Sequence, residues 1–285
     1  SITTSSDVNV SAEGAYSVTY SVTDISLNTA TATRSVEVVD TTIPIITLTG
    51  SSTITLEFGS AYVDEGATAS DTLDGNITGS IATSSNVNTN ALGTYTVRYN
   101  VSDNASNPAD EVTRTVEVVD TTIPVITLNG SSTLDIEFAS EYTDAGASAT
   151  DNVDDDTTIT NAIVATSTVN TGALGEYSVT YGVSDSSGNS ADEVVRIVNV
   201  VDTTAPVITL TGASTTTEAG VPYVDAGATA SDNVDNPATI TAAILATSTV
   251  NVSVIGDYEV RYNVTDSSNN PAVEVVRIVQ VRDSI

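Results

Sequence analysis

Residues 94–102 read TYTVRYNVS, a stretch in which apolar and polar side chains alternate strictly. Tyr95, Val97, Tyr99 and Val101 fall on one face of an extended chain, and polar residues fall on the other face. This alternation indicates a strand with one buried face and one solvated face. The surrounding sequence is rich in Val, Ile and Thr, which favour strands. The sequence therefore predicts an all-β fold.

A second string recurs along the chain and indicates the length of the folding unit. It reads VEVVDTTIP at 36–44, VEVVDTTIP at 116–124, VNVVDTTAP at 198–206 and VQVRDSI at 279–285. Its marker residues are Asp40, Asp120, Asp202 and Asp283, and their separations are 80, 82 and 81 residues (120−40, 202−120 and 283−202). A repeat of this length holds six or seven short strands, which predicts a β-sandwich of about 80 residues rather than one turn of a solenoid.

The repeat predicts three complete domains, at 40–119, 120–201 and 202–285, and half a domain at 1–39. The half domain is recognised because SITTSSDVNV at 1–10 aligns with SIATSSNVNT at 80–89. Half a sandwich cannot bury its core. We therefore expect its missing strands to come from upstream sequence in a longer array or from another molecule. In the first complete domain the expected strands are 45–48, 53–58, 66–70, 77–83, 94–102 and 111–119, with a weak strand near 86–90.

Composition excludes several classes of chemistry. The chain has 37 acidic residues against 7 basic ones, all of them Arg, and it lacks Lys, His, Cys, Met and Trp. A disulfide framework, a zinc or haem site, a P-loop and a Ser-His-Asp triad all lack their residues. A net charge of −30 would repel nucleic acid, and no apolar run is long enough for membrane insertion. With 40% hydrophobic residues the chain should nevertheless fold.

Three segments together resemble a known family. They are YVDEGATASDTLDGNIT at 62–78, LGTYTVRYNVSD at 92–103 and the VEVVDTTIP string. The chain is similar, over its whole length, to the bacterial surface immunoglobulin-like (Ig-like) tandem repeat that is also found in a pesticidal crystal protein. The resemblance implies Ig-like sandwiches and an extracellular protein of the cell surface. It implies no particular ligand or activity.

Recurrent tyrosines and arginines are predicted to be structural. Tyr95, Tyr177 and Tyr258 occupy the place of the tyrosine corner of Ig folds. Arg114, Arg196 and Arg277 each stand six residues before a marker aspartate. The alternation of strand 111–119 points Arg114 inward, unless a bulge shifts the strand. We expect a carboxylate to pair with this arginine at the rim of the sandwich.

Recurrent aspartates are the candidate metal ligands. In an Ig-like sandwich the start of the first strand and two of the loops meet at one end, so four acids of each repeat should gather there. A hard cation such as calcium would neutralise them, because Ca²⁺ takes six to eight oxygen ligands in flexible geometry. The alternative is that these acids only stabilise turns or adapt the surface to salt. The predicted ligands are Asp40, Asp71, Asp74 and Asp103, then Asp120, Asp151, Asp154 and Asp185, then Asp202, Asp232, Asp235 and Asp266.

These features favour a non-catalytic structural protein, a stiff calcium-stabilised array in a surface filament, adhesin stalk or surface layer. Its partners would be further repeats of the same chain or neighbouring copies of itself. The alternative is an adhesive module that recognises a glycan or a surface protein through two loops of each domain. One of these loops differs little between repeats, reading SDNASN at 102–107, SDSSGN at 184–189 and TDSSNN at 265–270. A two-carboxylate glycosidase would need a unique cleft, which similar small domains do not indicate.

Overall fold

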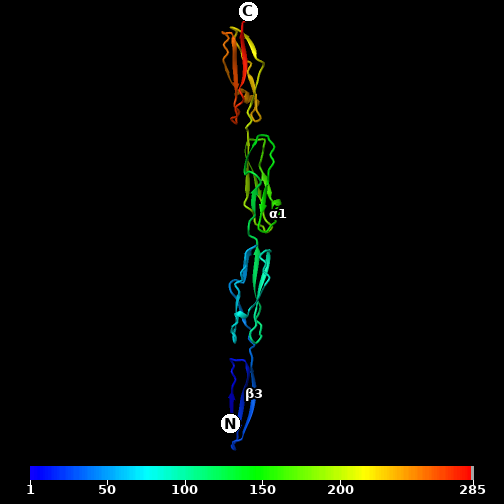
Figure 1. Cartoon of the computed structure of the whole chain (residues 1–285), viewed down its shortest axis with the longest axis vertical. Helices are drawn as coiled ribbons and strands as arrows, with labels where there is room; N and C mark the ends of the chain where they lie inside the picture. The colour runs from blue at the N-terminus through cyan, green and yellow to red at the C-terminus, as the bar shows by residue number, and fades with distance from the viewer. Residues whose placement is uncertain (284–285) are drawn as a thin grey trace. The chain divides into compact units, whose positions relative to one another are not determined.

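The computed structural model describes residues 1–283, and its regular secondary structure is mainly strand, with 47% strand and 5% helix (Figure 1). The all-β prediction is therefore confirmed. The last two residues of the predicted domain 202–285 lie outside the described part. The chain forms two compact units, Ser1–Thr122 and Ile123–Ile285, which are described separately below. Among the described residues, no helix has the length and apolar character needed to cross a membrane.

The first unit begins with a three-stranded antiparallel sheet of β1 (Ile2–Ser6), β2 (Gly14–Thr23) and β3 (Thr29–Val38), in that order. This sheet is the half domain, drawn in dark blue beside the N-terminal label in Figure 1. On its apolar face Tyr16, Val18 and Tyr20 of β2 are half-buried, and none of them is fully buried. Val22 is 43% exposed, whereas its counterpart in the first complete domain, Val101, is 6% exposed. The half domain thus has the strands of one sheet without the core of a sandwich.

The first complete domain is a sandwich of two sheets. Its elements are β4 (Ile45–Leu48), β5 (Thr53–Glu57), β6 (Ala67–Asp71), β7 (Gly75–Asn76), η1 (Thr78–Ser80), β8 (Ala82–Ser85), β9 (Gly93–Asn100) and β10 (Val112–Val119). One sheet has the order β5-β10-β9-β8 and the other β4-β6-β7. The pair β5–β10 is parallel and the other pairs are antiparallel. Val97 and Tyr99 from β9 pack against Ile46 and Ala69 from the opposite sheet, which forms the core that alternation predicted.

The second unit contains two further sandwiches of the same kind. The middle domain has β11 (Val125–Leu128), β12 (Thr133–Glu137), β13 (Ala147–Thr150), α1 (Asp156–Asn161), β14 (Val164–Ser167), β15 (Gly175–Gly182) and β16 (Val194–Val201). The last domain has β17 (Val207–Leu210), β18 (Thr215–Glu218), β19 (Ala228–Ser231), α2 (Pro237–Ala242), β20 (Leu245–Ser248), β21 (Gly256–Asn263) and β22 (Val275–Arg282). Their larger sheets have the orders β12-β16-β15-β14 and β18-β22-β21-β20.

Two strand predictions are wrong. The segment 77–83 forms the short helix η1 followed by the start of β8, and residues 86–90 form no strand. The reason is local hydrogen bonding by short polar side chains. The Asn76 side chain accepts a bond from the Thr78 amide (3.0 Å), and Thr78 Oγ1 donates to the Ala69 carbonyl (3.3 Å). In the later repeats Asp155 and Asn236 cap the helices α1 and α2 at this position.

Candidate metal centre

Three aspartates of the first complete domain meet at one end of its sandwich. Asp40 follows β3, Asp71 is the last residue of β6, and Asp74 lies in the turn before β7. One carboxylate oxygen from each of the three lies within 4.8 Å of the other two. Thr42 links two of them, because its hydroxyl donates to Asp40 Oδ1 (2.6 Å) and to Asp71 Oδ2 (3.3 Å). We call this set the first aspartate cluster.

Backbone amides hold the carboxylates of the first aspartate cluster in place. Asp71 Oδ1 accepts bonds from the amides of Leu73 (2.7 Å) and Asp74 (3.1 Å). These bonds lower the pKa of Asp71 below its ordinary value, because they favour the charged carboxylate. Asp40 Oδ2, by contrast, is buried and has no hydrogen-bond partner among the described residues. The cluster therefore contains a desolvated acceptor that the protein itself does not satisfy.

The last domain has an equivalent group, which we call the second aspartate cluster. Oxygens of Asp202, Asp232 and Asp266 lie within 4.8 Å of one another, and Asp202 and Asp266 are 8% and 7% exposed. Asp232 Oδ2 accepts the amides of Val234 (2.8 Å) and Asp235 (3.2 Å). Asp202 Oδ2 and Asp232 Oδ1 are buried without a hydrogen-bond partner in the described part of the chain. A buried acceptor left in this state costs about 1–3 kcal/mol.

The middle domain repeats the local turn. Asp151 Oδ2 accepts bonds from the amides of Val153 (2.8 Å) and Asp154 (3.1 Å), and Asp154 Oδ2 accepts the amide of Ser186 (2.9 Å). Asp151 Oδ1 is buried without a partner among residues 1–283. Asp120, at the end of the first unit, is 7% exposed and accepts the amide of Thr122 (3.2 Å).

The expectation that four acids of each repeat share one group needs correction. Asp103 is outside the first aspartate cluster and Asp235 is outside the second. Asn107 donates to both oxygens of Asp103, through its backbone amide (2.7 Å) and its Nδ2 (2.8 Å). Asn270 binds Asp266 in the same way, yet Asp266 belongs to the second aspartate cluster, so these bonds alone do not exclude a ligand. Asp185 is held in the same way by Asn189. Asp235 Oδ2 accepts the amide of Ser267 (2.9 Å), so this carboxylate stabilises the neighbouring loop.

The chemistry of both clusters suits a hard cation. All candidate ligand atoms in the two clusters are carboxylate oxygens. None of the ion pairs found among the described residues involves an aspartate of either cluster. Three like charges within 4.8 Å repel one another unless a cation neutralises them. Oxygen ligands in irregular loops fit calcium, whereas magnesium demands near-ideal octahedral geometry.

The recurrent arginine lies inside each sandwich, and β10 carries no bulge at this position. Arg114 is 0% exposed, and its register partner is Val97. Its guanidinium forms an ion pair with Asp64 and donates from Nε to the Ser51 carbonyl (2.9 Å). It also lies 5.8 Å from the centre of the Tyr99 ring. Arg196 and Arg277 make the same pairs with Asp144 and Asp225. The arginine is therefore structural in each complete domain.

The aspartate partners of these arginines could not be assigned from the sequence, although Asp64 recurs within the Tyr-x-Asp-x-Gly-Ala segment. Burial raises the pKa of Asp64, but hydrogen bonds from Tyr99 and Tyr62 and the charge of Arg114 outweigh this effect. The resulting pKa is below the ordinary value, so the pair stays charged at neutral pH. The same balance holds for Asp144 and Asp225.

The tyrosines of the predicted corner each close a local loop. The hydroxyl groups of Tyr95, Tyr177 and Tyr258 donate to the carbonyls of Ala91 (2.8 Å), Ala173 (3.0 Å) and Val254 (2.9 Å). Each bond reaches back four residues, which ties the loop to the strand that follows it. These tyrosines therefore hold the loop against the scaffold of their domain.

Sequence patterns did not single out a recurrent glutamate that ends one strand of the larger sheet in each complete domain. Glu137, the last residue of β12, accepts bonds from the hydroxyls of Thr203 and Thr204 (both 2.7 Å) and from Asn233 Nδ2 (3.1 Å). These bonds lower the pKa of Glu137 to about 2. Glu57 makes matching contacts with Thr121 and Thr122. The only signal in the sequence was the recurrence of Glu after an alternating strand, beside the Asp-Thr-Thr string.

Comparison with known proteins identifies relatives of the chain. It is 34% identical over 283 residues to hyalin of Strongylocentrotus purpuratus, covering 92% of this chain and 23% of hyalin. It is 29% identical over 217 residues to the pesticidal crystal protein Cry22Aa of Bacillus thuringiensis, covering 73% of this chain and 26% of that protein. The chain thus spans about a quarter of the length of these relatives.

Matches among solved structures include the carbohydrate-binding module CBM51-2 with INT domains from Clostridium perfringens ZmpB. That match has 28% identity and a TM-score of 0.23, and it covers 30% of this chain and 20% of that one. Protocadherin Gamma B2 cadherin domains 1–5 match with 12% identity and a TM-score of 0.36, over 95% of this chain and 66% of that one.

A family model described as "Bacterial surface protein, Ig-like domain" matches residues 1–38, 46–118, 126–200 and 208–281. Each match coincides with one of the sandwiches or with the half domain. The chain therefore belongs to the family of bacterial surface Ig-like domains.

Proposed function

We propose that the chain is a non-catalytic, extracellular structural protein in which calcium stabilises a stiff array of Ig-like domains. The observation that carries this proposal is the set of buried carboxylate oxygens without hydrogen-bond partners in the described residues, at Asp40, Asp202 and Asp232. Each belongs to a cluster of three aspartates with no basic partner. A bound cation would supply the missing ligand interactions and neutralise the repulsion.

The residues that would hold the ion are Asp40, Asp71 and Asp74 in the first aspartate cluster and Asp202, Asp232 and Asp266 in the second. Asp40 and Asp202 lie in the segments before β4 and β17, the first strands of their domains, whereas their cluster partners lie later in the same domains. A cation held by both would therefore stiffen the segment that leads into that domain. Membership of a family of bacterial surface domains supports a location outside the cell.

Near-identical repeats support a structural rather than a catalytic role. The Arg–Asp–Tyr network, the tyrosine corner and the turn at Asp71, Asp151 or Asp232 recur in every complete domain. A filament or stalk needs equivalent modules, whereas an active site needs a unique arrangement. The partners of the array would be further repeats of the chain or copies of it.

Thermal unfolding tests this proposal. The full chain is melted at constant ionic strength with calcium, with magnesium and with a chelator. We expect calcium to raise the melting temperature, because a ligand at 100 times its Kd stabilises the folded state by about 2.7 kcal/mol. Magnesium should give a smaller shift.

A pair of matched variants completes the test. Asp202→Asn with Asp232→Asn removes two charges from the second aspartate cluster, and Asp110→Asn with Asp192→Asn removes two exposed charges elsewhere. Only the first pair should reduce the calcium response. If NaCl restores the stability of the chelated protein as well as calcium does, or both pairs respond equally, the acids act as diffuse charge and the proposal is wrong.

A further inference from the structure

One face of the middle domain differs from the same face of its neighbours. The four-stranded sheets of the three complete domains align residue for residue, so each has an equivalent outer face. In the first domain this face carries Arg98, Asn100 and Glu111. The last domain carries Arg261, Asn263 and Glu274 at these positions. The middle domain carries Thr180, Gly182 and Glu193, so it keeps the glutamate and lacks the other two side chains.

In the flanking domains the arginine and asparagine bind the glutamate. Arg98 Nη1 donates to Glu111 Oε1 (2.5 Å), and Asn100 Nδ2 donates to Glu111 Oε2 (3.0 Å). These bonds lower the pKa of Glu111, with the Asn100 bond making the largest contribution. The last domain repeats both bonds at 2.5 and 3.0 Å, between Arg261, Asn263 and Glu274. The outer face of these domains is thus occupied by the domain's own guanidinium.

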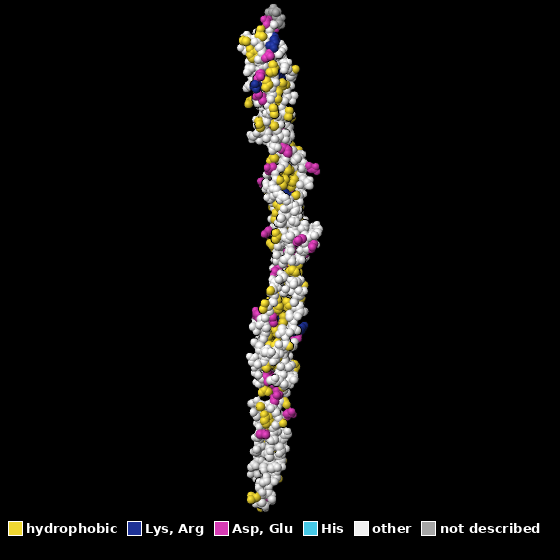
Figure 2. All heavy atoms as spheres, in the orientation of Figure 1, with side chains coloured by type: hydrophobic (Ala, Val, Ile, Leu, Met, Phe, Trp, Pro, Cys, Tyr) yellow, Lys and Arg dark blue, Asp and Glu magenta, His cyan; other side chains and the backbone are white. Residues whose placement is uncertain are grey.

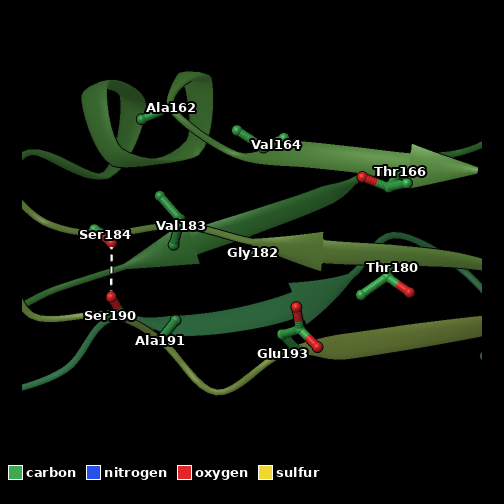
Figure 3. A pocket seen from close by; sticks show the side chains of 10 residues that line it. All are labelled: Ala162, Val164, Thr166, Thr180, Gly182, Val183, Ser184, Ser190, Ala191 and Glu193. Carbon is green, nitrogen blue, oxygen red and sulfur yellow. Dashed lines mark hydrogen bonds between the residues drawn. The ribbon is translucent and has the colours of Figure 1, made fainter.

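In the middle domain the same place is a groove of about 640 Å³. Figure 3 shows Glu193 on one side of the groove, Val164 on the other, and Gly182 on the strand between them. A Cβ atom added to Gly182 would meet nothing within 4 Å, which shows that the groove is open at its floor. Val164 is 68% exposed and supplies an apolar wall. The Ser184 and Ser190 hydroxyls, 2.9 Å apart, border one end.

We propose that this groove binds an arginine side chain presented by a partner protein, in the place where the flanking domains carry their own. The Glu193 carboxylate would accept the guanidinium as Glu111 accepts that of Arg98. The absence of a side chain at Gly182 leaves room for the planar group, and the alkyl stem would pack on Val164. The partner is thus a protein segment that bears an arginine beside small or apolar residues.

Charge favours such a partner. The chain has a net charge of −30, and Figure 2 shows many more acidic than basic side chains on the displayed face. A negative surface speeds the approach of a basic segment and retains it weakly in any orientation. The groove would add a single preferred position. This inference does not depend on calcium binding.

Nuclear magnetic resonance titration of the ¹⁵N-labelled full chain tests the proposal. The probe is the capped peptide acetyl-Thr-Val-Arg-Tyr-Asn-amide, which copies residues 96–100, and the control peptide has neutral citrulline in place of arginine. We expect shifts confined to the groove around Val164, Gly182 and Glu193. The citrulline peptide should bind about fivefold more weakly, which corresponds to the upper end of the range for an exposed ion pair.

Three variants sharpen the test. Glu193→Gln should weaken binding about as much as citrulline does. Thr180→Arg with Gly182→Asn should fill the groove and remove the shifts, and neither change is strained because the flanking domains carry these residues. Arg98→Thr with Asn100→Gly should open a second groove and add shifts around Glu111. The proposal is overturned if no binding occurs, if the shifts spread over all acidic residues, or if Glu193→Gln leaves them unchanged.

Discussion

Replacing the buried arginine of one domain is expected to destabilise that domain alone. In Arg114→Met the apolar stem is retained and the guanidinium is lost. Arg114 donates to the carbonyls of Ser51 (2.9 Å), Thr49 and Gly66 (3.2 Å), and it pairs with Asp64. These three carbonyl groups lose the Arg114 donor in the variant. Each carbonyl that stays buried without another donor costs about 1–3 kcal/mol of stability. Removing one partner of a buried ion pair typically destabilises a protein by about 3–5 kcal/mol, and we expect the free energy of unfolding of this domain to fall by an amount in this range.

Hydrogen exchange measured by mass spectrometry on the full chain can resolve this loss. Peptides from β9 and β10 report on the altered domain, and peptides from β15 and β16 provide an unaltered reference in the same sample. The matched control is Arg98→Met, because Arg98 is 52% exposed and its ion pair is worth less than about 1 kcal/mol. If Arg114→Met and Arg98→Met both cost less than about 1 kcal/mol, the inward network does not stabilise the fold as argued.

Three further predictions concern the same scaffold. The pKa of Asp64 is lower in the folded domain than its unfolded value of about 3.9, so its contribution is complete above that pH and is lost as the pH falls through the folded value. Asp64→Asn should therefore be less stable at pH 7 and show a weaker acid dependence, in denaturant titrations at several pH values. Tyr95→Phe loses one hydrogen bond and should reduce stability by about 1 kcal/mol, measured by hydrogen exchange across the loop at Ala91. Unchanged exchange in this loop would show that the tyrosine corner does not stabilise it. The ¹³C carboxyl resonance of Glu137 should titrate with a midpoint of about 2, and a midpoint near 4.3 would contradict its contacts with Thr203 and Thr204.

The strands and the inward arginine could be predicted because they depend on short-range alternation. Val97 and Tyr99 are buried on the face that alternation assigned to the core. Arg114 shares the parity of Val116, and both are fully buried. Periodicity of two residues is a property of any extended strand, so it can be read without knowledge of the partner strand.

The side chains that pair with each buried or clustered charge could not be predicted, because the pairing depends on which segments of the chain the sandwich brings together. Asp64 lies 50 residues before Arg114 in the chain, and no spacing rule connects them. Asp103 falls outside the first aspartate cluster, whereas its counterpart Asp266 belongs to the second, although Asn107 and Asn270 bind their oxygens in the same way. No feature of the sequence separates these two aspartates. The short helices were missed for a related reason, since the capping side chains of Asp155 and Asn236 outweigh the strand propensity of the residues that follow.

Calcium at the aspartate clusters is the central claim, and an anomalous diffraction map tests it most directly. Crystals of the full chain grown in calcium, without other divalent ions, would be measured at a wavelength at which calcium scatters anomalously. We expect a peak about 2.3–2.6 Å from Asp202 Oδ2 and from Asp232 Oδ1, the two buried oxygens of the second aspartate cluster that have no partner among the described residues. Ordered aspartates with no anomalous peak between them, at a saturating calcium concentration, would contradict the account.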